Sequence, residues 1–203
     1  MTNTYRLLLI IVFLIFFYLL SVFKRGKLEL AKFALGTIGL FLTLFFAFND
    51  VATPFLAKLV TFCSGIIGEM TGMYQAYPYN SLLFISHKGE TISLYIDYEC
   101  AGFVEMIIFI SLLVFFPLYN WFNKIMYGVL GISLLFLSNI LRLVFICTSV
   151  YLGGNGAFYM SHAILGRVLF YTLSMCVYFY IFTRPQIARQ KIGRFTYDKN
   201  TDK

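Results

Sequence analysis

The chain has 203 residues, of which 60% are hydrophobic and only 12% are charged. A soluble domain is typically about half apolar and a quarter charged, so this composition excludes an ordinary soluble protein and indicates one integral membrane domain over residues 1–203. The net charge of +7 does not indicate nucleic-acid binding, because the basic residues cluster beside apolar segments, as in cytoplasmic loops. The four cysteines and two histidines lack zinc-site spacing, so we expect neither a metal nor a cofactor.

The first predicted span runs from Tyr5 to Phe23. About 20 apolar residues are enough to cross the hydrocarbon core of a bilayer. A signal peptide is the poorer interpretation, because the apolar run is too long and no small-residue cleavage site follows it. Lys24, Arg25, Lys27 and Lys32 come next. This basic loop predicts a cytoplasmic position, and hence an amino terminus on the outside.

The second span is expected over Ala31 to Phe48, running outward. Pro54 after the cap-like Thr53 then predicts a new helix start. From Thr53 to Tyr74 apolar residues recur at helical spacing, which favours an amphipathic helix on the outer surface; an additional span is the alternative. The segment from Gln75 to Asn80 is rich in turn residues and is predicted to be a linker.

Two short runs, Leu82 to Ser86 and Thr91 to Asp97, flank a turn-like segment. The second run alternates apolar and polar residues, so we expect a short β-hairpin. His87 falls in its turn and is interpreted as a solvated residue. The second strand leads to Cys100, at the head of the next helix.

Three more spans are predicted: Cys100 to Leu118 inward, Ile125 to Leu152 outward, and Phe158 to Phe182 inward. A flexible outer loop, Gly153 to Gly156, joins the last two. The basic tail, residues 184–203, is expected in the cytoplasm, in agreement with the first loop. The expected fold is thus an all-α polytopic protein of the plasma membrane, with about five transmembrane helices, an outer amphipathic helix and a hairpin.

This topology places three reactive side chains, Cys100, Arg142 and His162, in the outer half of the membrane. The dipole of a helix start favours the thiolate form of Cys100, which is the nucleophilic form. A buried arginine can hold the oxyanion of a reacting carbonyl, and a histidine can relay a proton. We therefore expect the three to converge in a pocket open to the outside.

Each of these residues also has a structural interpretation. An arginine inside a span costs several kcal/mol and usually faces a partner. Arg142 can simply pair with Glu105, an intramembrane carboxylate. Asn139, three residues before Arg142, is expected to orient it. Arg167 is interpreted as a structural partner of Glu105, or else as a contact for a substrate charge.

Three segments carry a family resemblance: Glu-Cys-Ala-Gly-Phe at 99–103, Ser-Asn-Ile-Leu-Arg-Leu at 138–143 and Ser-His-Ala-Ile-Leu-Gly at 161–166. They resemble the motif blocks of the exosortase/archaeosortase family, most closely its small Gram-positive branch. The resemblance implies that Cys100 is the nucleophile, Arg142 the transition-state stabiliser and His162 the third catalytic residue. Ala101 departs from the serine that commonly follows the cysteine.

The resemblance implies a membrane-embedded cysteine transpeptidase or protease. Its expected substrate is a secreted protein with a carboxyl-terminal sorting signal, comprising a short motif, an apolar helix and a basic end. The alternative function is a non-catalytic membrane component of surface polysaccharide or glycoprotein assembly or export, in which Arg142, Arg167 and Glu105 contact a polar head group. A small transporter is less favoured, because the sequence has no internal repeat or paired broken helices.

Overall fold

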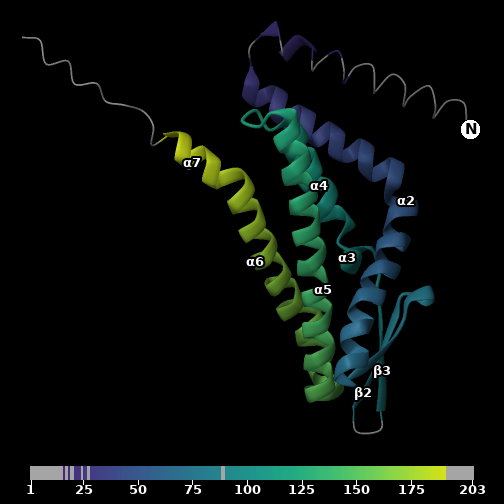
Figure 1. The fold of residues 1–203 in the computed structure, drawn as a ribbon. Coiled ribbons are helices and arrows are strands. Elements are labelled where there is room, and N and C mark those ends of the chain that lie inside the picture. The colour runs from purple at the N-terminus through teal and green to yellow at the C-terminus, as the bar shows by residue number, and fades with distance from the viewer. Residues whose placement is uncertain are drawn as a thin grey trace, which may run out of the picture.

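The computed structural model describes residues 28–87 and 90–190, together with 16, 18, 21–23, 25 and 26. These residues are mostly helical, and a small sheet lies at one end of the helices (Figure 1). Two helical segments, Leu30–Thr71 and Trp121–Ile187, are long and apolar enough to cross a membrane, and Phe103–Phe115 is a shorter apolar helix. The predicted first span falls mostly outside the described residues, as does the tail after residue 190.

Helix α2 (Glu29–Thr71) joins two segments that the sequence divides. The predicted helix start at Thr53 is wrong, because the helix continues through it and Pro54 lies inside. Thr53 instead donates a hydrogen bond from Oγ1 to Asn49 Oδ1, 3.0 Å away on the preceding turn. A proline inside a helix removes one hydrogen bond and crowds the carbonyl four residues earlier, which bends the helix. Figure 1 shows this bend. The expected second span and the expected amphipathic helix are therefore the two parts of α2 on either side of the bend.

The sheet has three antiparallel strands in the order β1 (Tyr74–Tyr77), β2 (Leu82–His87), β3 (Glu90–Tyr95). The predicted hairpin is present as β2 and β3, with His87 opposite Glu90. The predicted linker is wrong: its residues form β1 and a short 3-10 helix, η1 (Pro78–Asn80). An additional strand lets Tyr74 bury its ring, and its hydroxyl donates to Ser64 O of α2 at 2.7 Å.

The expected single helix from Cys100 to Leu118 is divided by Gly102. Before it lies the short helix α3 (Tyr98–Ala101), and after it lies α4 (Phe103–Phe115). Gly102 has φ 75, a left-handed conformation that glycine adopts without the steric cost of a Cβ. The chain therefore changes direction between the thiol and the apolar helix.

Helix α5 (Trp121–Tyr159) is interrupted within the expected outer loop by a kink at Gly154, with φ 64 and ψ −155, and helical structure resumes directly after it. Beyond it come η2 (Met160–Leu165), α6 (Gly166–Tyr178), η3 (Phe179–Thr183) and α7 (Arg184–Gln190), where η2 and η3 are π-helical. Figure 1 shows α6 returning along α5. One glycine thus replaces the predicted loop, because glycine alone readily adopts these dihedral angles.

His87 stays partly exposed, as the sequence suggests, and it also contacts this kink. Its Nδ1 lies 2.6 Å from the carbonyl oxygen of Tyr151. A Cβ at Gly154 would lie only 2.8 Å from His87 Cδ2. The tip of the hairpin is therefore tied to the end of α5.

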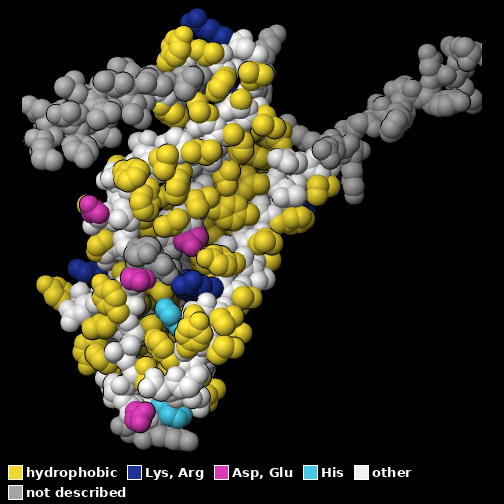
Figure 2. All heavy atoms as spheres, turned by 180° about the vertical axis from the view of Figure 1, so that it is seen from behind, with side chains coloured by type: hydrophobic (Ala, Val, Ile, Leu, Met, Phe, Trp, Pro, Cys, Tyr) yellow, Lys and Arg dark blue, Asp and Glu magenta, His cyan; other side chains and the backbone are white. Residues whose placement is uncertain are grey.

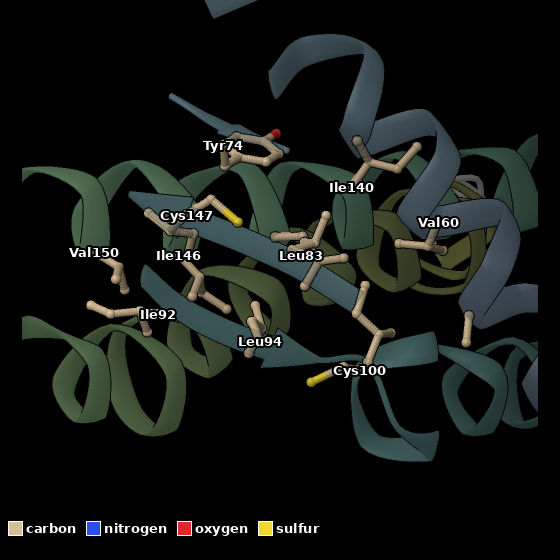
Figure 3. Packing of buried hydrophobic residues seen from close by; sticks show 14 of the residues in the cluster. Val60, Tyr74, Leu83, Ile92, Leu94, Cys100, Ile140, Ile146, Cys147 and Val150 are labelled. Carbon is tan, nitrogen blue, oxygen red and sulfur yellow. The ribbon is translucent and has the colours of Figure 1, made fainter. Parts of the chain in front are cut away.

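Two hydrophobic clusters fill the interior. The sheet cluster joins the sheet to the carboxyl-terminal halves of α2 and α5, and it includes Val60, Leu83, Ile85, Leu94, Ile146 and Cys100 (Figure 3). The aromatic cluster joins α4, α5 and α6, and it is built around Phe109, with Phe116, Tyr119, Tyr178 and Phe182 in ring contact.

Candidate active site

Cys100 is held by a tight turn that Asp97 closes. The Cys100 N–H approaches both the main-chain oxygen of Asp97, at 3.1 Å, and its Oδ1, at 3.3 Å. This is the hydrogen bond that a helix-capping aspartate makes. Figure 3 places Cys100 just beyond the strand that carries Leu94. The residue is only 2% exposed, so the thiol is shielded from bulk water.

Two residues of α5, three positions apart, contact Cys100 from one helix face. Asn139 Nδ2 donates to the Cys100 main-chain oxygen at 2.7 Å. Arg142 Nη2 lies 3.7 Å from Cys100 Sγ. Both side chains are buried, Asn139 completely and Arg142 with 3% exposed. The expected role for Asn139 was to orient Arg142, whereas its measured bond holds the backbone that carries the thiol.

Gly102 brings Asn139 and Cys100 together. A Cβ at Gly102 would lie 3.2 Å from Asn139 Nδ2, so a larger residue would press on the amide that binds the Cys100 carbonyl. The left-handed φ of Gly102 adds a second requirement for glycine. The Cys-Ala-Gly segment is thus shaped around Asn139.

The guanidinium of Arg142 contacts a thiol and an aromatic ring in an apolar interior. Besides the sulfur, it lies over the ring of Phe170, with Cζ 5.7 Å from the ring centroid. A cation this close to a thiol favours the thiolate, and low polarity strengthens the attraction. Arg142 therefore contacts Cys100, and its pairing with Glu105 stays a prediction.

His162 lies in the π-helix η2, half-buried, with its ring stacked on Phe158 at a centroid distance of 5.7 Å. Gly166 packs against Ile146 where α6 crosses α5. The structure thus brings Cys100 and Arg142 into contact, and the approach of His162 to these two residues stays a prediction.

Arg167 lies on α6, and its side chain is exposed. Figure 2 shows acidic, basic and histidine side chains gathered in the middle of a face that is otherwise mostly hydrophobic. A hydrophobic surface around a polar patch suits a protein surrounded by lipid, in which polar side chains are kept where they can serve a function.

Sequence reasoning missed two residues of this site. Asp97 could have been found, because an aspartate immediately before a helix is a typical capping residue. Phe170 had no such signal, since one aromatic residue in an apolar span resembles any other. Its position against Arg142 depends on how α6 packs on α5.

A buried thiol beside a guanidinium provides a nucleophile and a donor for a developing oxyanion. A family model described as transmembrane exosortase (Exosortase_EpsH) matches residues 2–180, which include every site residue described above. No curated protein and no solved structure matches the chain. The family match covers most of the chain, so this protein belongs to the transmembrane exosortase family.

Proposed function

We propose that this protein is a cysteine transpeptidase or protease that cleaves a carboxyl-terminal sorting signal of secreted proteins at the outer membrane face. The observation that carries the proposal is the distance of 3.7 Å between Arg142 Nη2 and Cys100 Sγ, inside an apolar interior. A buried charge is costly unless its interactions compensate it. A thiolate at Cys100 supplies such an interaction and is at the same time the reactive form of the residue.

In the proposed reaction, the Cys100 sulfur attacks a peptide carbonyl carbon. Arg142 stabilises the negative oxygen of the tetrahedral intermediate. The bond between carbon and nitrogen then breaks, and the leaving amine takes a proton from His162. The resulting acyl-thioester is resolved by an amine, which gives transfer, or by water, which gives hydrolysis. Asn139 and Asp97 hold the Cys100 backbone during these steps and are positioning residues.

The proposed topology has five spans, with the amino terminus outside and the carboxyl terminus in the cytoplasm. Two separate basic clusters support it, one after the first span and one in the tail after Arg184. Cys100 then faces the outside of the plasma membrane, at the level where a substrate helix leaves the bilayer. The whole chain, residues 1–203, acts as one domain in this proposal.

The alternative function, a non-catalytic component of surface-polymer assembly, needs charged side chains that reach a polar head group. Arg142 is 3% exposed and its guanidinium approaches a thiol, which suits catalysis better. Arg167 is exposed and remains compatible with either function. The position of Arg142 therefore favours the enzyme.

The test compares cells that carry the wild-type chain, Cys100→Ala or Cys100→Ser. Mass spectrometry of the carboxyl-terminal peptides of secreted and membrane proteins identifies those that lose processing. Both variants are expected to abolish it, while Cys176→Ala, at an exposed cysteine of α6, leaves it intact. Unchanged carboxyl termini in both Cys100 variants would reject the function.

A further inference from the structure

Within the described ranges, strand β3 pairs with β2 alone, so it forms one edge of the sheet. In an edge strand, alternate residues direct their N–H and C=O groups away from the sheet. The Ile96 N–H donates to Ser81 O at 2.9 Å, so the even-numbered residues face β2. The main-chain groups of Thr91, Ser93 and Tyr95 therefore point outward, and no hydrogen bond to another described segment uses them.

This open edge leads directly to the candidate nucleophile. Only four residues separate the end of β3 from Cys100, and the intervening turn is closed by Asp97. The face of β3 that carries Ile92 and Leu94 is buried in the sheet cluster. Packing on that face holds the strand against the cluster that also contains Cys100, so its edge is a row of donors and acceptors that leads along the chain toward the thiol.

We propose that the outward edge of β3 binds the extended segment of the substrate that precedes the scissile bond, by main-chain pairing as an additional strand. The inference rests on the proposed function, because it assigns the peptide-binding site of the same reaction. Strand addition draws its affinity from main-chain hydrogen bonds and therefore accepts varied side chains.

The direction of pairing follows from the substrate's own membrane helix. In the proposed reaction that helix follows the scissile bond and enters the bilayer beside Cys100. The segment before the bond must then approach Cys100 from the hairpin tip, in the same direction as β3. The pairing is therefore parallel, and the substrate residues alternate between facing the sheet edge with their N–H and C=O groups and facing away.

Proline at Ser93 tests the strand edge. Ser93→Pro removes an N–H that faces away from β2, a position where edge strands tolerate proline. Ser93→Ala is the matched control, because it removes the hydroxyl and keeps the N–H. For the substrates identified by Cys100→Ala, we expect Ser93→Pro to lower the processed fraction at least tenfold and Ser93→Ala to leave it near wild type.

The rate of Cys100 alkylation by iodoacetamide reports on the site without any substrate. Ser93→Pro is expected to leave this rate unchanged, since pairing with the substrate does not affect the free thiol. Equal processing by Ser93→Pro and Ser93→Ala would overturn strand pairing while the proposed function stands. If Cys100→Ala changes no carboxyl terminus, the proposed function fails and this inference fails with it.

A proline scan of the substrate gives a second readout that cannot disturb the fold of the enzyme. Proline is placed in turn at each of the four residues before the cleavage site found by mass spectrometry. Strand pairing predicts loss of processing at every second position, because only alternate N–H groups face β3. Uniform tolerance, or equal loss at all four positions, would overturn the inference even if Ser93→Pro failed to fold.

Discussion

The sheet cluster and the aromatic cluster are both buried and apolar, yet the polar side chains within them bind different partners. In the aromatic cluster the tyrosine hydroxyls donate to helix carbonyls, Tyr119 to Ile181 O at 2.5 Å and Tyr178 to Glu105 O at 3.2 Å. In the sheet cluster Tyr74 donates to a helix carbonyl in the same way, but Asn139 and Arg142 also converge on Cys100, one on its backbone and one on its sulfur.

This difference separates a structural core from a site. A hydroxyl that donates to a helix carbonyl satisfies itself and leaves the backbone in place. A guanidinium beside a thiol creates a reactive pair whose cost must be compensated elsewhere in the fold. We therefore expect substitutions in the aromatic cluster to change stability, and those around Cys100 to change the reaction.

The largest effect is expected from Phe109→Ala, which empties the centre of the aromatic cluster. Phe109 is completely buried and contacts the rings of Tyr178 and Phe182. Truncating such a residue costs about 3–5 kcal/mol of the free energy of unfolding. Unfolding of the purified protein in mixed micelles measures the loss, and the alkylation rate of Cys100 in the folded fraction should not change. A slower rate would show that the two clusters are not separate.

Arg142→Ala comes next, and its effect should fall on the reaction. Removing one donor to a developing oxyanion typically lowers a rate by about 10²–10³-fold, or about 2.7–4 kcal/mol. The processed fraction of the substrates measures this loss, and Arg142→Lys should recover part of it, because it keeps the charge but not the planar fork. Arg184→Ala, at an exposed arginine over Tyr180, is the control. Wild-type processing by Arg142→Ala would contradict its proposed role.

Asn139→Ala should have an intermediate effect on both properties. It leaves the buried Cys100 carbonyl without its measured donor, a loss of about 1–3 kcal/mol. The unfolding free energy and the processed fraction should both decrease, since the turn that carries the thiol loses an anchor. The neighbouring Ser138→Ala is the matched control, because its hydroxyl bonds only within its own helix, to Leu134 O at 2.8 Å. Equal effects of the two substitutions would contradict the anchoring role.

The smallest effect is expected from Tyr178→Phe. It removes one hydrogen bond between α6 and α4 and keeps the ring contacts. Such bonds between membrane helices contribute about 0.6 kcal/mol on average. The same micelle experiment measures the change, with processing as the second readout. A large loss of processing would link the aromatic cluster to the site through Glu105.

The sequence was most informative where pattern and chemistry are local. Alternating residues predicted the hairpin of β2 and β3, and the apolar runs predicted the long helices and the membrane class. The motif segments pointed to Cys100 and Arg142, which the fold brings into contact. Their roles in a reaction stay predictions until Cys100 and Arg142 are substituted.

The sequence was least informative where tertiary packing overrides a local signal. Pro54 resembles a helix start, but the helix continues through it, and Thr53 donates a hydrogen bond to Asn49 on the preceding turn. Gly153 to Gly156 resemble a loop, but one residue, Gly154, is enough for the reversal when His87 packs against it. The level of His162 along α5 depends on how two helices cross, which spacing along one chain does not determine.

The π-helical turn at Met160–Leu165 determines which side chains of the following helix, α6, point toward α5. A π turn accommodates one residue more than an α turn, and one residue corresponds to about 100° of rotation around the helix axis. The wide turn therefore sets the direction, around the helix axis, in which the side chains of α6 point. One of these is the ring of Phe170 under the guanidinium of Arg142. Deleting a single residue there would turn that ring away from Arg142 while leaving the hydrophobicity of the span intact.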